Sequence, residues 1–428
     1  MTRPSGKRAK SRPLALTRGQ DDPDPDPMGH GDTTGERVGR WGAIPYILMV
    51  WCVSRVMLTG VGVLARSWLG QVDYGSNVQL NFDIGTGYAW LDIWSAWDAR
   101  WYYPIADVGY LNAPVDHLPG FDATHSSWAF FPLYPWVAQL LAMGVGNTYI
   151  AFLIVSNVSI LIGAWLFYKL VEQHRDSATA RRAVLFLFLF PTAYVFSCLM
   201  TESLFFALSV GAWYCARQGN WLLAGALGMG STMTRMVGLF MAPLLALEYL
   251  RQRQWRLVRV RPDVLWIGLV PVGLGVFMAF CYITTGNPLK FKEAQDAWAT
   301  GTSGVNPLYA LYRSMEKAWL GGFNVFDGPL ALAYGAIAAV VGTGVLLWGR
   351  KQIGNLLCLW SLTLIILPLS AHIYTFSIPR YLVVLFPLYM ILASMRTNSV
   401  AFVITVVVLI LLQAATFALW TTGNVMGF

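Results

Sequence analysis

Long apolar runs separated by short polar segments are the dominant pattern of this chain. Most runs are about 17 to 25 residues long, which is enough for a helix to cross a hydrocarbon layer of ~30 Å. The pattern therefore predicts an all-α polytopic membrane protein with about 11 transmembrane helices. Their approximate bounds are 41–65, 148–170, 183–200, 202–217, 221–236, 237–250, 263–285, 329–348, 354–372, 380–396 and 399–420.

A further apolar run at 129–145 is short, contains Pro132 and Pro135, and carries Trp and Tyr residues of the interfacial kind. With this run outside the membrane core, about two thirds of the 30 Lys and Arg residues fall on the cytoplasmic side. Counting it as a span would move the basic cluster at 169–182 to the other side, against the positive-inside rule. We therefore place it in an outer loop. The predicted organisation is a tail at 1–40, a transmembrane domain at 41–420 with a first outer loop at 66–147 and a second outer segment at 286–328, and a short tail at 421–428.

Composition supports this membrane assignment. Hydrophobic residues make up 56% of the 428 residues and charged residues 12%, and the mean hydropathy is +0.52; a soluble domain has roughly 25% charged residues. The net charge of +8 lies in short clusters between apolar runs, so it indicates topology and no nucleic-acid partner. The five Cys residues all lie in apolar segments and suggest packing.

The first 40 residues differ from the rest, because RPSGKRAKSRP and DDPDPDP contain too few apolar residues to fold. They do not have the pattern of a cleavable signal peptide. We expect a disordered cytoplasmic tail.

The first outer loop carries the densest candidate chemistry, WSAWDARWYYPIADVGY around Asp98. Trp97 and Trp101 would partly desolvate this carboxyl group, which favours a general base near neutral pH. Alternatively, Asp98 caps a short helix that starts at Ala99. The local sequence leaves both interpretations open. The loop holds seven Asp residues: Asp73, Asp83, Asp92, Asp98, Asp107, Asp116 and Asp122.

Other charged residues fall at the same predicted membrane face. Glu202 lies in FSCLMTESLFF, between two apolar runs, either as part of a binding site or in a capping box. Arg235 lies where two short spans meet, and Arg380 opens a span in SIPRYLVVLFP. Guanidinium groups match phosphate oxygens, so these Arg residues predict binding of a lipid phosphate. Arg55 falls in the middle of a span and requires either a partner or a polar cavity.

The second outer segment contains GNPLKFKEAQDAW, in which Gln295 and Trp298 are one helical turn apart and could face one pocket. An amphipathic helix resting on the membrane surface is the alternative. The sequence contains no P-loop, no dinucleotide fingerprint and no Ser-His-Asp arrangement, and its histidines are scattered. We expect no metal and no cofactor.

Taken together, WDARWYYPIADVGY, AFFPLYPW, VSN at 155–157, FPTAYVFSCLMTESLFF, TRMVGL and IPRYLVVLFP resemble the PIG-V-type mannosyltransferases, the family of GPI mannosyltransferase 2 and its bacterial relatives. The resemblance covers roughly residues 41–396 and implies the GT-C superfamily fold, with the chemistry on the non-cytoplasmic face. The element GNPLKFKEAQDAW resembles the bacterial branch, so we expect a bacterial cell membrane. It implies that Asp98 is the catalytic base and that Trp97, Tyr110, Phe131 and Pro132 belong to the same signature. It also places Asn157, Glu202, Arg235 and Arg380 on polar positions typical of the family.

The resemblance implies transfer of mannose from a polyprenyl-phosphate donor to a hydroxyl group of a glycolipid, glycan or protein acceptor. Asp98 would accept the hydroxyl proton, and Arg groups would stabilise the departing phosphate. One alternative is another sugar on the same lipid phosphate. Another is a transporter of lipid or sugar, although the sequence shows no internal repeat of the kind common in transporters.

Overall fold

The computed structural model describes residues 42–70, 86–113, 126–298, 306–322 and 328–423, except for the side chains of residues 297 and 298. All structural statements below concern these residues. The predicted tail at 1–40 lies outside them, as does most of the predicted tail at 421–428. Four of the acids in the first outer loop and two of its histidines also lie outside: Asp73, Asp83, Asp116, Asp122, His117 and His125. The proposed division into domains stays a prediction.

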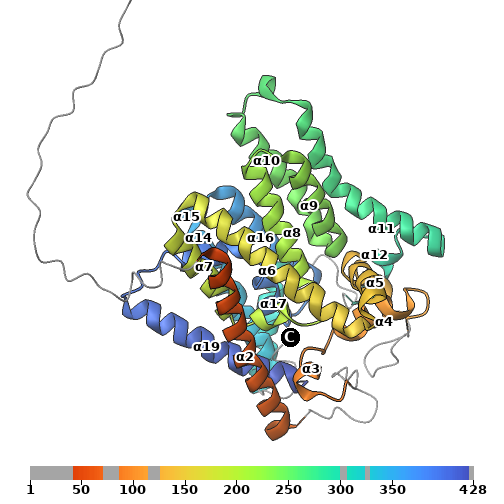
Figure 1. Ribbon diagram of the computed structural model, residues 1–428, viewed down its shortest axis with the longest axis vertical. Helices are drawn as coiled ribbons and strands as arrows, with labels where there is room; N and C mark the ends of the chain where they lie inside the picture. Colours follow the sequence, from red (N-terminus) through yellow and green to blue (C-terminus); the bar gives the residue numbers. More distant parts are fainter. Residues whose placement is uncertain (1–41, 71–85, 114–125, 299–305, 323–327, 424–428) are drawn as a thin grey trace, which may run out of the picture. The chain divides into compact units, whose positions relative to one another are not determined.

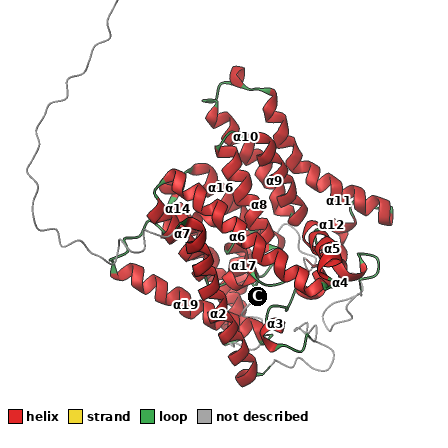
Figure 2. Ribbon diagram, viewed as in Figure 1, coloured by secondary structure: helices red, strands yellow, loops and turns green. Residues whose placement is uncertain are grey.

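The described residues form helices joined by turns, without a strand among them (Figures 1 and 2). The longer helices are α2 (Ala43–Leu69), α4 (Ala99–Val108), α5 (Leu133–Val145), α6 (Thr148–His174), α7 (Ser177–Leu189), α8 (Glu202–Arg217), α9 (Trp221–Thr234), α10 (Met241–Gln252), α11 (Leu269–Thr285), α12 (Lys290–Trp298), α13 (Pro307–Leu320), α14 (Pro329–Trp348), α16 (Asn355–Ala371) and α19 (Val400–Thr421). The short ones are α3 (Ala89–Asp92), α15 (Arg350–Ile353), α17 (Ile378–Leu382), α18 (Phe386–Leu392) and the 3₁₀ helices η1 (Ser127–Ala129), η2 (Ala193–Phe196), η3 (Met236–Phe240), η4 (Leu257–Arg259) and η5 (Pro262–Gly268).

Five of the described helical segments are long and apolar enough to cross a membrane: α2, α6, η5 with α11, α14 and α19. Two shorter apolar helices, α5 and α16, accompany them. The chain is thus an all-α, multi-pass membrane protein, which confirms the predicted fold class. The count of about 11 transmembrane helices stays a prediction.

Several predicted spans agree closely with the observed helices. The span at 329–348 coincides with α14, and 202–217 coincides with α8. The run at 129–145 forms the short helix α5 after Pro132. The predicted first outer loop also contains α3, η1 and α4, and α4 starts at Ala99 as predicted.

The predicted span at 183–200 is wrong as one helix. Helix α7 ends at Leu189, and Phe190 has extended dihedrals (φ −60°, ψ 141°) directly before Pro191. Proline lacks the backbone N–H that a continuing helix needs, and it disfavours helical dihedrals in the residue before it. The apolar sequence therefore continues through η2 as a series of turns. The predicted span at 380–396 is similarly divided into α17 and α18, and the span at 237–250 into η3 and α10.

Helix α8 lies at the centre of the packing, between α6 and α9, and α9 in turn packs on α11 (Figure 1). A second group is formed by α2, α7 and α19, and a third by α13, α14, α16 and α17. Glycines allow the closest approaches: a Cβ atom at Gly225 would lie 1.9 Å from the carbonyl oxygen of Trp266, and one at Gly335 would lie 2.0 Å from that of Thr375. These helices therefore depend on glycine for contact of backbone with backbone.

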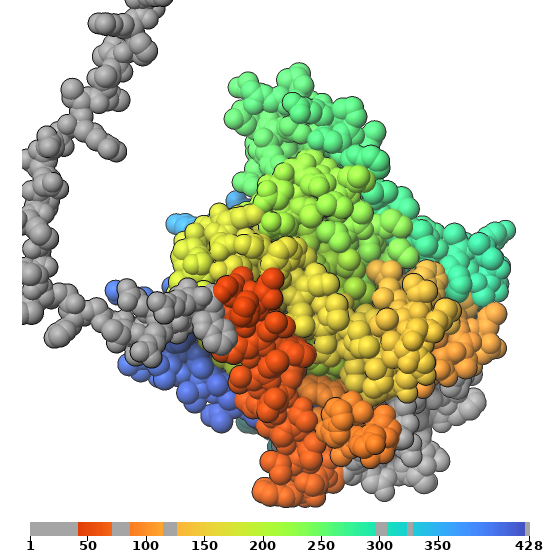
Figure 3. All heavy atoms as spheres, in the orientation of Figure 1, coloured from red at the N-terminus to blue at the C-terminus, as the bar shows by residue number. Residues whose placement is uncertain are grey.

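The charge pattern assigns each helix end to one side of the membrane, and ends assigned to the same side contact one another. At the predicted cytoplasmic side, Tyr46 donates to the carbonyl group of Arg181, and Arg182 donates to that of Ala393. At the other side, Arg66 donates to Thr421 and to the carbonyl group of Asp92. Arg66 thus joins three chain segments. Figure 3 shows the surface that these helices form.

Candidate active site

Asp98 lies between α3 and α4, directly after a strained residue. Trp97 has a φ angle of +57°, which is rare for a residue with a side chain. Such strain concentrates at functional sites, where the surrounding fold holds it in place. Asp98 occupies the N-cap position of α4, but its side chain makes no capping hydrogen bond. The cap interpretation is therefore wrong, and the carboxylate is directed to another partner.

That partner is Arg380, which lies far away in sequence on α17. The Nη2 atom of Arg380 is 2.6 Å from Oδ2 of Asp98, and its Nε atom is 2.7 Å from Oε1 of Glu202. The same carboxylate oxygen of Glu202 pairs with Nη1 of Arg235. Asp98, Arg380, Glu202 and Arg235 thus form a continuous chain of ion pairs, called here the charged quartet.

The quartet carries two positive and two negative charges, so its formal charge is zero. Its two inner members are buried, with side-chain exposures of 0% for Glu202 and 6% for Arg380. Its two end members are more accessible, at 17% for Asp98 and 16% for Arg235. Buried charges are tolerated when they are paired and hydrogen-bonded. The inner pair can therefore serve as a fixed support, while both ends can reach a ligand.

Breaks in the helices bring these four side chains together. Glu202 begins α8 after the turns that follow Pro191, where its negative charge suits the helix N-terminus. The predicted capping box is wrong, since Thr201 makes no capping hydrogen bond. Arg235 has extended dihedrals between α9 and η3. Arg380 follows Pro379, whose carbonyl group accepts a hydrogen bond from Thr192 at 2.8 Å.

Aromatic rings surround the two arginines and Asp98. The guanidinium carbon of Arg235 lies 4.9 Å from the ring centre of Tyr381, and that of Arg380 lies 5.8 Å from the same ring. Tyr102, on the first turn of α4, is buried against Phe130 and Tyr134. Burial raises the pKa of Tyr102 above its usual range, and the negative charge of Asp98 raises it further, so the phenol stays protonated. Tyr102 and Tyr381 were not predicted as site residues, although they lie inside the motifs WDARWYYPIADVGY and IPRYLVVLFP.

A small, mostly apolar pocket of about 20 Å³, lined by described residues, reaches the Arg235 end of the quartet. Arg235 is the only charged residue that lines it. The other lining residues are apolar or aromatic and come from α8, η3, α16, α17 and the turn after α17: Phe205, Val237, Leu364, Pro368, Tyr381 and Val384. The pocket has room for about one water molecule, so it shows only that the Arg235 guanidinium lies among apolar side chains here.

The remaining predicted site residues lie in supporting positions. Asn157 accepts hydrogen bonds from Trp51 and Ser197 and donates to the carbonyl group of Leu153, so it holds the segment before Glu202. The hydroxyl group of Tyr110 donates to the carbonyl group of Phe130 at 2.7 Å, and its ring stacks on Trp128. Both residues thus have their polar atoms engaged within the protein.

The second outer segment packs onto the first. Gln295 on α12 donates to the carbonyl group of Ala129 in η1 at 3.2 Å, and Phe291 packs against Phe131 and Phe277. α12 is thus docked on the protein through one face. The side chain of Trp298 lies outside the description, so its predicted role stays a prediction. Among the described residues, no group of three His, Cys, Asp or Glu side chains is arranged to hold a metal ion.

Arg55 has a partner that the sequence did not reveal. Both of its terminal nitrogens donate to the carbonyl oxygen of Ala193, at 3.3 and 3.2 Å, and its guanidinium lies over the ring of Phe188. It therefore satisfies a backbone group in the turns after Pro191, the same segment that leads to Glu202. This contact explains a buried arginine in the middle of α2.

The fold and site describe a multi-pass helical membrane protein with a charge-balanced, partly accessible cluster beside a small, mostly apolar pocket. No family model matches the sequence, and no curated protein matches it. Among solved structures, the chain is similar to ArnT from Cupriavidus metallidurans bound to undecaprenyl phosphate, with 13% identity, a TM-score of 0.48, and coverage of 90% of this chain and 77% of that one.

It is also similar to the Archaeoglobus fulgidus oligosaccharyltransferase in complex with Zn and sulfate, with 14% identity, a TM-score of 0.42, and coverage of 88% of this chain and 53% of that one. A further similarity is to AglB from the same organism in complex with an inhibitory peptide and a dolichol-phosphate, with 13% identity, a TM-score of 0.39, and coverage of 86% and 55%. The chain thus spans about half the length of these archaeal proteins. At these TM-scores the similarities assign neither a family nor an activity.

Proposed function

We propose that this chain is a membrane glycosyltransferase of the GT-C superfamily that transfers mannose from a polyprenyl-phosphate donor to a hydroxyl group of a glycolipid or glycan acceptor. The observation that carries the proposal is the charged quartet, in which an accessible carboxylate and an accessible guanidinium are held at the two ends of one buried ion-pair chain. The sequence motifs around Asp98, Glu202, Arg235 and Arg380 support the same function.

The proposed reaction is a single displacement with inversion. The acceptor hydroxyl group attacks the anomeric carbon of the donor and passes its proton to the Asp98 carboxylate. The bond between that carbon and the phosphate oxygen breaks, and its electrons leave with the lipid phosphate. The ion pair with Arg380 fixes the orientation of Asp98, which favours attack from one defined direction.

Arg235 is the better candidate for the donor phosphate. It is more exposed than Arg380, and the side chains beside it are mostly apolar, which suits a phosphate that carries a hydrocarbon chain. Arg380 was predicted to bind phosphate as well, but its Nε and Nη2 atoms already contact two carboxylates. We therefore propose that Arg380 mainly positions Asp98 and Glu202.

The proposal is tested with purified protein in proteoliposomes, given labelled polyprenyl-phosphate mannose and a panel of lipid, glycan and protein acceptors. Asp98→Asn should lower transfer by roughly 10²- to 10⁴-fold, the usual contribution of a general base, while binding of labelled donor is retained. Asp107→Asn is the matched control: Asp107 lies on the same helix and accepts a hydrogen bond from Thr148 on the protein surface, so transfer should be unchanged.

Arg235→Gln should weaken donor binding, because the phosphate loses a charged partner, whereas Asp98→Asn should not. Near-normal turnover by the Asp98→Asn protein would reject the base assignment. Transfer of glucose or arabinose instead of mannose would correct the donor sugar and leave the mechanism in place. Movement of labelled lipid across the bilayer without transfer to any acceptor would favour a transporter.

A further inference from the structure

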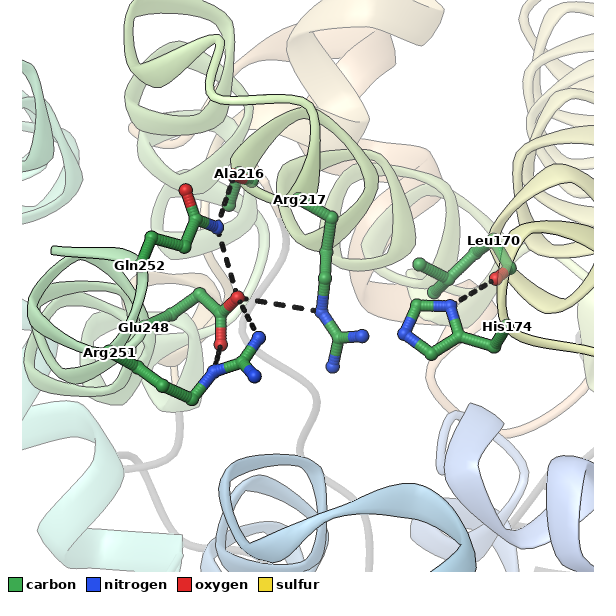
Figure 4. A network of polar contacts seen from close by, with 7 residues as sticks. All are labelled: Leu170, His174, Ala216, Arg217, Glu248, Arg251 and Gln252. Atoms are coloured by element: carbon green, nitrogen blue, oxygen red, sulfur yellow. Dashed lines mark hydrogen bonds and ion pairs between the residues drawn. The ribbon is translucent and has the colours of Figure 1, made fainter. Parts of the chain in front are cut away.

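A second charged cluster lies at the opposite end of α8 from the quartet. Glu248 on α10 is fully buried, and its carboxylate accepts from Nε and Nη2 of Arg251, at 2.9 and 2.6 Å, and from Gln252 at 3.0 Å. Arg217, the last residue of α8, lies beside it. Figure 4 shows the Arg217 guanidinium between the Glu248 carboxylate and the imidazole of His174.

Arg217 is poorly compensated in this cluster. Its Nε atom is 3.6 Å from Oε1 of Glu248, which is beyond hydrogen-bonding distance, and this nitrogen is buried without a hydrogen-bond partner in the described part of the chain. Glu248 supplies one negative charge for two guanidinium groups. The nearby His174 ring is committed through Nδ1 to the carbonyl group of Leu170. The cluster is therefore short of one anion.

The adjoining surface has the composition of a membrane interface. The segment after α10 presents apolar side chains to the outside, with exposures of 59% for Trp255, 75% for Leu257 and 93% for Val258. Arg256 and Arg259 alternate with them. Gln254 and Trp255 both have positive φ angles, so the backbone turns sharply as it presents this segment. Exposed aromatic and apolar residues among arginines are typical of contact with anionic lipid head groups.

We propose that Arg217 and Arg251 form a phosphate-binding site at this end of α8, whose ligand is the phosphate of an anionic lipid head group. The Arg217 guanidinium offers a forked pair of donors to phosphate oxygens, and Arg251, whose Nε and Nη2 atoms bind Glu248, adds its Nη1 atom. The site is separate from the quartet: α8 has 16 residues, which places its ends on the order of 20 Å apart. The inference does not depend on the proposed glycosyl transfer.

The test measures thermal unfolding of the full-length protein in nanodiscs of phosphatidylcholine, with and without added phosphatidylglycerol, and by native mass spectrometry counts the anionic lipids retained. Wild-type protein should unfold at a higher temperature with the anionic lipid and should retain it. Arg217→Gln should lose most of that shift and bind the lipid about tenfold more weakly, the equivalent of one charge-assisted hydrogen bond. Lys351→Gln removes one charge from another predicted cytoplasmic loop and should behave like wild type.

Glu248→Gln separates an anion site from a purely structural ion pair. Removing the carboxylate leaves two guanidinium groups uncompensated, so this variant should retain the anionic lipid more tightly than wild type, even if it is less stable without it. If the cluster is only a structural ion pair, each variant should lose the same stability relative to wild type with and without phosphatidylglycerol. That result would reject the proposal. Inorganic phosphate is added to phosphatidylcholine nanodiscs as a further arm. If inorganic phosphate reproduces the Arg217-dependent rise in unfolding temperature and phosphatidylglycerol does not, the ligand is free phosphate and the lipid assignment is rejected.

Discussion

Arg380 is the residue on which the candidate site depends most. It is the only described member of the quartet that contacts both carboxylates, and its planar fork allows Nε and Nη2 to bind different partners at 2.7 and 2.6 Å. A lysine carries the same charge but presents it at a single point, so it cannot reproduce both contacts.

Arg380→Lys should therefore lower the free energy of unfolding by about 1–3 kcal/mol and lower transfer by roughly tenfold or more, because Asp98 loses its fixed orientation. Both effects are measured on the same preparation, by thermal unfolding in detergent and by the transfer assay. Arg313→Lys is the control, since Arg313 pairs with Glu316 on the exposed surface of α13, where ion pairs contribute little. Wild-type stability and turnover in Arg380→Lys would show that the bridge has no role.

The sequence predicted which four residues lie near one another, but it could not predict the contacts between them. The sequence placed Asp98, Glu202, Arg235 and Arg380 at helix ends on one membrane face, because each lies at the boundary of an apolar run. It could not show that Arg380 bridges Asp98 and Glu202, since Arg380 and Glu202 are 178 residues apart. The partner of Arg55 could not be predicted either, for a different reason. It is a backbone carbonyl group, which a pattern of side chains does not reveal.

At the scale of elements, helix α7 depends on an acidic cap. The side chain of Asp176 accepts hydrogen bonds from the backbone N–H and the hydroxyl group of Thr179, both at 2.8 Å. These bonds, the backbone one first, lower the pKa of Asp176 below its usual value. A lowered pKa means that the stabilisation is complete above the carboxyl pKa of the unfolded chain and is lost as the pH falls through the folded value.

Asp176→Ala should cost about 1 kcal/mol of stability at neutral pH, and this difference from wild type should shrink as the pH is lowered toward the folded-state pKa. Asp176→Asn can still accept from Thr179 without titrating, so its stability should not show that acid-dependent loss. Unfolding midpoints at neutral and acidic pH measure both effects. An acid-dependent loss of equal size in wild type and Asp176→Asn would assign it to other groups.

The contact of α9 with α11 depends on one glycine of a closely spaced pair. A Cβ atom at Gly273 would lie 2.4 Å from the carbonyl oxygen of Met229, whereas one at Gly275 would meet no atom within 4 Å. Gly273→Ala should therefore separate the two helices and destabilise the protein by about 1–3 kcal/mol, and Gly275→Ala should be neutral or slightly stabilising because alanine favours helix. Thermal unfolding of both variants measures the difference. Equal effects would show that α11 adjusts at no cost.

Elements were predictable where the apolar pattern and the helix agree in length. The run that became α14 begins at a proline and ends at a glycine, both of which mark helix boundaries, and its bounds were predicted without error. The runs around Pro191 and Pro387 are equally apolar, and hydrophobicity alone joined pieces that proline separates. Breaks in membrane helices bring backbone groups and charged side chains to a site. The wrongly predicted spans therefore lie next to Glu202 and Arg380 of the quartet.

At the scale of the whole molecule, α8 connects two charged clusters of different character. Its first residue, Glu202, belongs to a balanced quartet with accessible ends, and its last, Arg217, belongs to a cluster with excess positive charge. The positive-inside rule predicts that the second cluster lies on the cytoplasmic side. The proposed donor site would then face the opposite side of the membrane, as a lipid-linked sugar donor on the non-cytoplasmic face requires.

This orientation predicts the labelling of single introduced cysteines in cells that express the protein. Asn112 and Gln218 are both exposed, the first in the loop after α4 and the second directly after α8. With the exposed native Cys52 replaced, a membrane-impermeant maleimide should label Asn112→Cys in intact cells. It should label Gln218→Cys only after the membrane is permeabilised, because the bilayer would separate the loop after α4 from the C-terminal end of α8. Transfer activity of each variant shows that the fold is retained. The reverse labelling would show that the topology is inverted and that the quartet lies on the cytoplasmic side. The proposed lipid-linked donor would then have to be presented on the cytoplasmic leaflet.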